Sequence, residues 1–155
     1  MMRFLIKLFI GCLPICANAQ HQVNVWVFAN GNKLDFGSAP PQVLSGTSIF
    51  PTDGEVEGVA CISDEEGNLL FYSDGVSLWD GTNALITDQL LGHQSSTNSA
   101  YIVPVPGSTS RYYLFTLDAM QNNLANGLRY SLIEVCSTQR SVSLLETNQL
   151  LSTNM

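Results

Sequence analysis

Apolar residues alternate with polar ones along most of this chain, and the alternation is interrupted by clusters of Gly, Pro, Asn and Asp. A period of two places successive side chains on opposite faces of an extended strand. The interruptions carry the residues that favour tight turns, and no window of about a dozen residues keeps the apolar stripe of a helix. The sequence therefore predicts an all-β fold of short antiparallel strands. We expect strands over residues 23–29, 58–63, 69–73, 76–79, 84–86, 100–104, 112–117, 128–135 and 141–145.

Two segments follow the same plan, one starting at Ala60 and the other at Ala100. Each opens an apolar strand with a small residue, turns at a glycine, continues in an aromatic-rich strand and ends at an aspartate, Asp74 or Asp118. Propeller blades are short meanders that repeat about every 40 to 50 residues, and stacked blades bury both faces of each meander. The sequence therefore predicts antiparallel meanders that form about two blades of a partial β-propeller, with an open β-sandwich as the alternative.

Residues 1–19 have the pattern of a signal peptide. Met1–Lys7 is short and basic, Leu8–Ile15 is apolar, and Ala17–Ala19 supplies the small residues that a signal peptidase needs. We expect cleavage near Ala19 and a secreted or cell-surface location for the rest, with lipidation at Cys12 or Cys16 as the less favoured alternative.

The remaining residues, 20–155, are acidic. They number 136 and carry a net charge of −9, because four basic and thirteen acidic residues remain. A field of this sign disfavours binding to nucleic acid and to anionic membranes, and no apolar run reaches the roughly 20 residues of a transmembrane helix. A closed propeller needs roughly 160 residues. We therefore expect a truncated propeller-like domain, one completed by self-association, or an open sandwich.

Three alternating carboxylates form a candidate calcium site. An extended backbone would direct Asp53, Glu55 and Glu57 to the same side, and Ca²⁺ prefers six to eight oxygen ligands. The same residues also fit a solvated acidic edge that discourages strand-to-strand aggregation, which is the interpretation we favour. We expect no other cofactor.

Cys61 and Cys136 are the cysteines outside the signal region. A disulfide between them would close a long loop and favour the folded state by about 4 kcal/mol. Two separate buried thiols that pack as small hydrophobic groups are the alternative that we favour.

Four residues are candidates for ligand binding: Glu57, Asp74, His93 and Asp118. His93 precedes the polar run Gln94–Ser99, a loop that a ligand could contact, although a structural hydrogen bond within the loop is the interpretation that we favour for this histidine. A glycoside hydrolase would need two carboxylates across a cleft, with Glu57 and either aspartate as the pair. Nothing in the sequence pairs them, so we assign no catalytic residue.

A series of short motifs follows in a fixed order along the chain: Asn24–Gly31, Leu34–Phe36, Glu57, Ala60–Asp64, Gly67–Val76, Leu90–His93, Ser95–Thr97, Ser99–Pro104, Tyr113–Asp118 and Gly127–Ser131. In this order they resemble the N-terminal region of large Bacteroidetes surface proteins of the gliding-motility and type IX secretion kind. The resemblance implies a secreted propeller-like region with an adhesive role, and it supplies no catalytic residues to carry over to this chain. It also implies following immunoglobulin-like or polycystic-kidney-disease-type repeats and a sorting domain, and the chain departs from that pattern by ending at Met155.

Together these features predict a non-catalytic extracellular β module that binds a glycan or a cell-surface protein. The alternative is a fragment of an exported glycan-active hydrolase.

Overall fold

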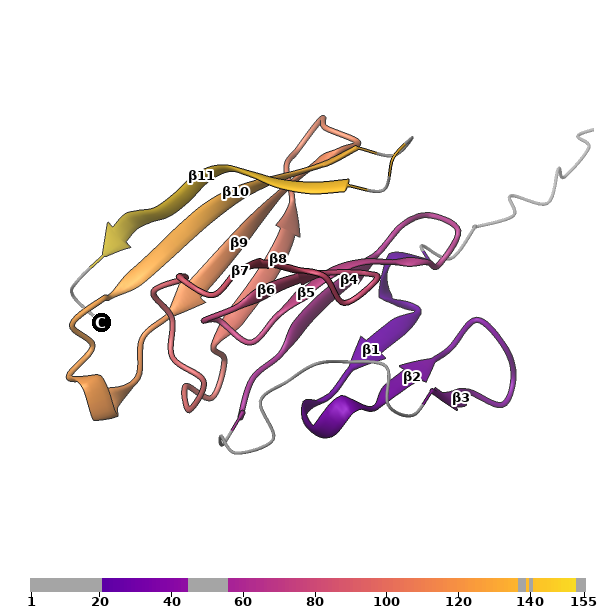
Figure 1. Cartoon of the computed structure of the whole chain (residues 1–155), viewed down its shortest axis with the longest axis horizontal. Helices are drawn as coiled ribbons and strands as arrows, with labels where there is room; N and C mark the ends of the chain where they lie inside the picture. The colour runs from indigo at the N-terminus through magenta and orange to yellow at the C-terminus, as the bar shows by residue number, and fades with distance from the viewer. Residues whose placement is uncertain (1–20, 45–55, 137–138, 140, 153–155) are drawn as a thin grey trace, which may run out of the picture.

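The structure of the protein is a computed structural model that describes residues 21–44, 56–136, 139 and 141–152. Within these residues the fold is all-β, as the alternation predicts, and the strands form three antiparallel sheets, none closed on itself (Figure 1). Three single-turn 3-10 helices accompany the strands: η1 (His21–Val23), η2 (Ala29–Gly31) and η3 (Met120–Asn122). No helix among the described residues is long and apolar enough to cross a membrane.

The first sheet contains β1 (Val25–Val27), β2 (Lys33–Asp35) and β3 (Gln42–Leu44), paired in chain order. The strand predicted over residues 23–29 is shorter than expected, because η1 and η2 occupy its two ends. The sequence did not predict β2 and β3.

The second sheet contains β4 (Ala60–Ser63), β5 (Leu69–Ser73), β6 (Leu78–Asp80) and β7 (Leu85–Thr87). The third contains β8 (Ala100–Pro104), β9 (Arg111–Leu117), β10 (Leu128–Cys136) and β11 (Ser141–Ser152). Each is a four-stranded meander in chain order, so the repeat seen in the sequence corresponds to two equivalent sheets. The last strand is longer than predicted, and β6 begins two residues later than predicted.

The middle sheet, β4–β7, is covered on both faces. Phe71 and Leu78 point toward the third sheet, where they join a core that contains Tyr112 and Leu114. The neighbouring residues Tyr72 and Trp79 point the opposite way, toward Val25 and Val27 of the first sheet. Because successive side chains of β5 and β6 pack on opposite neighbours, the middle sheet holds the three sheets together as one stack.

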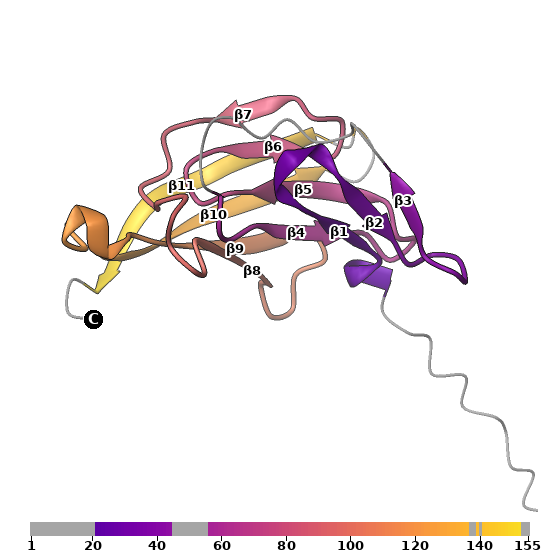
Figure 2. The same ribbon diagram turned by 90° about the horizontal axis from the view of Figure 1, so that it is seen from below.

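The opening strands of the three sheets lie next to one another. Strand β1 contacts β4, and β4 contacts β8. Figure 2 shows these strands following one another along the lower side of the molecule. Three successive meanders thus share one wall formed by their opening strands.

Candidate functional site

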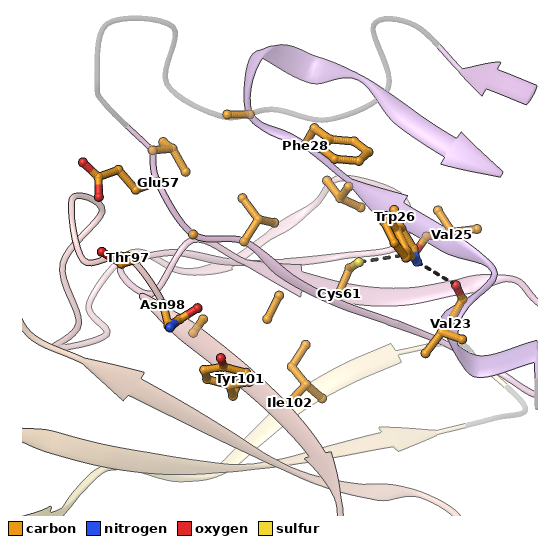
Figure 3. A pocket seen from close by; sticks show the side chains of 17 residues that line it. Val23, Val25, Trp26, Phe28, Glu57, Cys61, Thr97, Asn98, Tyr101 and Ile102 are labelled. Atoms are coloured by element: carbon orange, nitrogen blue, oxygen red, sulfur yellow. Dashed lines mark hydrogen bonds between the residues drawn. The ribbon is translucent and has the colours of Figure 1, made fainter. Parts of the chain in front are cut away.

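A groove of about 690 Å³ runs along this wall. Its volume is within the usual range for small-molecule sites, 300–1,000 Å³. Residues from β1, β4 and β8 and from the segments next to these strands form the groove, and Figure 3 shows their side chains. Most of the lining is apolar, with members such as Val25, Val59 and Ile102.

One end of the groove is polar. Glu57, Thr97 and Asn98 lie there, on the segments that lead into β4 and β8 (Figure 3). The Glu57 side chain is exposed, and its backbone N–H donates to the carbonyl oxygen of Gln94 at 2.9 Å. A second hollow of about 390 Å³ opens from the same three residues and extends toward Met120. The polar end therefore joins two concave surfaces.

Exposed aromatic side chains line the groove on both sides. Tyr101 on β8 is 56% exposed, because it alternates with the buried Ala100. Trp26 on β1 is half exposed, and its indole N–H donates to the carbonyl oxygen of Val23 at 3.1 Å. A broad apolar ring beside amide and carboxylate groups can stack on a ligand while the polar groups orient it.

Asp74, one of the predicted binding residues, is completely buried. Its carboxylate accepts hydrogen bonds from the backbone N–H groups of Val76 at 2.9 Å and Ser77 at 2.7 Å, and from the Gln94 side chain at 2.6 Å. The structure therefore places Asp74 inside the turn between β5 and β6, and it lines neither hollow.

Asp118 has the same kind of environment after β9. Its carboxylate accepts hydrogen bonds from the backbone N–H groups of Ala119 and Asn126, at 2.8 and 2.7 Å, and from the Asn122 side chain. Asp118 also lines the second hollow together with Glu57, although only 1% of its surface is exposed. Of the four predicted residues, these two are brought to the same hollow.

His93 is half-buried in the loop before β8. Its Nδ1 lies 2.9 Å from the Ser95 hydroxyl, and it accepts from the Ser95 backbone N–H at 3.2 Å. The ring therefore stabilises its own loop through these hydrogen bonds, and it lines neither hollow.

Of the predicted calcium ligands, Asp53 and Glu55 lie outside the described residues, and only Glu57 can be placed. The described residues contain no group of three or more His, Cys, Asp or Glu side chains suited to a metal ion.

The two cysteines lie in different sheets as separate thiols. Cys61 in β4 donates to the carbonyl oxygen of Val25 at 3.2 Å, and burial raises the pKa of its thiol. Cys136 ends β10 and is exposed, so it does not pack as a small buried group.

Lys33 is a buried charged residue that no pattern in the sequence indicates. Its ammonium group lies 5.4 Å from the centre of the Tyr72 ring and donates to the Asn83 side chain at 3.3 Å. Burial lowers the pKa of Lys33, while its interaction with Cys61 has a smaller opposite effect. Lysine is rarely buried without a charged partner, so this residue joins the first two sheets at an electrostatic cost.

Comparison of the chain with protein-family models, with characterised proteins and with solved structures finds no match.

Proposed function

We propose that this chain is a non-catalytic module of propeller type that binds a neutral glycan in the groove along β1, β4 and β8. The groove carries the proposal because it places an exposed tyrosine ring near a polar end formed by Glu57, Thr97 and Asn98. Export to the cell surface belongs to the same proposal, and it is supported by the N-terminal pattern and the resemblance described above.

The propeller part rests on how successive sheets meet. Ser99, at the entry to β8, is completely buried, and its hydroxyl donates to the carbonyl oxygen of Gly58 at 2.6 Å. Its own carbonyl oxygen accepts from the backbone N–H of Leu117 at 3.1 Å. The first bond ties the entry of the third meander to the entry of the second, which is the relationship between neighbouring blades around an axis, and the second bond holds Ser99 within its own meander.

The glycan part rests on the chemistry of the groove. A tyrosine ring offers an apolar face to the C–H groups of a sugar, and carboxylate, amide and hydroxyl groups can bond to sugar hydroxyls. Tyr101, Glu57 and Asn98 supply these groups. The acidic character of the chain disfavours polyanionic glycans, so the ligand class is neutral.

The non-catalytic part rests on the two buried aspartates. Asp74 and Asp118 already accept backbone hydrogen bonds from the turns that follow them. A glycosidase needs one carboxyl group as acid and a second as base or nucleophile, both facing the bond to be cleaved. Glu57 is exposed in the groove, but both aspartates are engaged in holding loops.

Calorimetric titration with neutral hexasaccharides of the cello, xylo and manno series tests the proposal. We expect binding to at least one series, and an affinity loss of about tenfold, or about 1.4 kcal/mol, for Tyr101→Ala and for Asn98→Ala. Leu85→Ala, an exposed apolar residue outside the groove, is the control. Absence of binding to all three, or unchanged affinity of Tyr101→Ala, would contradict the proposal. Sustained release of reducing ends that Glu57→Gln abolishes would favour a hydrolase.

A further inference from the structure

We propose that the glycan is an internal segment of a linear neutral polysaccharide, which runs from the groove across its polar end into the second hollow. The proposal rests on the glycan binding proposed above, and it names the length of the ligand and the part of the polysaccharide that is recognised. Three observations support it: the two hollows meet, hydrogen bonds hold the loops on both sides of the place where they meet, and free polar side chains face it.

The second hollow begins where the groove ends. Glu57, Thr97 and Asn98 line both of them, so a ligand that fills the groove up to its polar end already touches the lining of the second hollow. The groove encloses about 690 Å³ and the second hollow about 390 Å³. A short oligosaccharide stacked on Tyr101 would occupy the groove alone, whereas a longer one would occupy both hollows.

The far ends of both hollows lie at the surface of the protein. Figure 3 shows Val23 at the opposite end of the groove from Glu57, and Val23 is 67% exposed. The second hollow extends to Met120, which is 75% exposed. Because exposed side chains stand at both far ends, a polysaccharide can continue past each of them into solvent. Recognition therefore does not require the end of a sugar chain.

Hydrogen bonds hold both sides of the passage between the hollows. On one side, the backbone N–H of Glu57 donates to the carbonyl oxygen of Gln94 at 2.9 Å, and the Gln94 side chain donates to the buried Asp74 at 2.6 Å. On the other side, the Asp118 carboxylate accepts backbone N–H groups of the loop that carries Gln121. A surface that is already ordered loses little conformational entropy when a ligand binds.

Free polar side chains face this passage. Thr97, Asn98 and Gln121 are exposed, and none of their side chains makes a hydrogen bond with another described residue. By contrast, Asp118 and Ser95 in the same hollow are bonded within their own loops. The three free side chains can therefore bond to sugar hydroxyls, which both donate and accept. Gln121 lines the second hollow and not the groove, so a change there affects one hollow alone.

Calorimetric titration of the full chain with trisaccharides and hexasaccharides of the cello, xylo and manno series tests the length of the ligand. We expect the hexasaccharide of the bound series to bind more tightly than its trisaccharide. Gln121→Ala should weaken hexasaccharide binding by about three- to tenfold and leave trisaccharide binding within about twofold, because only the longer ligand reaches the second hollow. Gln149→Ala, at an exposed glutamine of β11 that lines neither hollow, is the matched control.

Two kinds of failure are distinguishable in this titration. Equal affinity for the two lengths, or a Gln121→Ala variant that affects both lengths equally or neither, would overturn the present proposal and leave glycan binding in the groove standing. Absence of binding at either length would contradict the proposed function itself, and the present proposal with it.

The stoichiometry of binding to a soluble linear polysaccharide of the same series, of defined chain length, tests whether internal segments are recognised. Internal segments outnumber the two ends of each polysaccharide chain, so we expect several copies of the protein to bind to one chain. A stoichiometry of one copy per polysaccharide chain would show that a chain end is recognised, and it would overturn the proposal.

Discussion

Asp74 and Asp118 occupy equivalent positions in the two four-stranded sheets. Each follows the second strand of its meander, each is at most 1% exposed, and each carboxylate accepts hydrogen bonds from two backbone N–H groups of the next loop. Charge-assisted bonds of this kind are about twice as strong as neutral ones. The repeat in the sequence therefore reflects a repeated way of holding the loop after the second strand.

Replacing Asp118 by asparagine should destabilise the fold. The amide that replaces one carboxylate oxygen would face backbone N–H groups as a donor, so at least one bond is lost in a buried site. We expect the free energy of unfolding to fall by about 1.5 to 3 kcal/mol in urea titrations. Asp88→Asn, at an exposed position, should change it by less than about 0.5 kcal/mol. Equal effects of the two variants would contradict this role for Asp118.

Gly75 marks a close approach between the second and third sheets. It has a φ of +90°, and an added Cβ would lie 2.7 Å from the Ser99 carbonyl oxygen. Gly107 has a similar φ of +78° but has no atom within 4 Å of an added Cβ. Gly107→Ala should therefore lower the free energy of unfolding by about 1 to 2 kcal/mol, from the strain of a left-handed backbone alone. Gly75→Ala should lower it by about 1 to 3 kcal/mol more, because the added Cβ also clashes with the backbone. Thermal unfolding of both variants measures the difference, and equal losses would show that the sheets can separate there at no cost.

The sequence was sufficient to predict the all-β class and the repeat that begins at Ala60 and Ala100, because alternation and turn residues are local signals. It was insufficient for the short strands β2 and β3. Strand β2 contains Lys33, whose burial depends on Tyr72 and Asn83, about forty and fifty residues away. The extension of β11 to Ser152 likewise depends on its pairing with β10, which no local pattern encodes.

The site was harder to predict than the fold. Aspartates at turns are chemically able to bind ligands or to cap loops, and only the three-dimensional structure shows that Asp74 and Asp118 are buried in their own loops. The exposure of Tyr101 could have been predicted from the sequence, since alternation with Ala100 places its side chain on the opposite face from the core. Asn98 lies in the polar run Gln94–Ser99, which indicates a polar loop, but its position in the groove depends on where β1 and β4 lie.

Lys33 should give the protein a distinctive pH dependence. Burial lowers its pKa below the ordinary value of 10.5, so between the two pKa values the unfolded state binds more protons than the folded state. Stability then rises with pH across that window. We expect the unfolding free energy of the wild type, relative to Lys33→Met, to increase from neutral pH to about pH 10.5 in urea titrations. The pair cancels the contributions of groups that do not interact with Lys33, and a Cys61→Ser background in both proteins removes the contribution of Cys61, which does interact with it. A difference independent of pH would contradict the expectation.

Thr116 offers a stabilising substitution. Its hydroxyl is buried in β9 and, among the described residues, has no hydrogen-bond partner, so the folded state bears the cost of removing it from water. Valine has nearly the same shape without the polar atom, and Thr116→Val should raise the free energy of unfolding by about 1 kcal/mol. Thr82→Val is the matched control, because the exposed Thr82 hydroxyl donates to Asp80 at 2.7 Å and its loss should lower stability slightly. A loss of stability in Thr116→Val would instead reveal a partner, such as a bound water, at the junction of the second and third sheets.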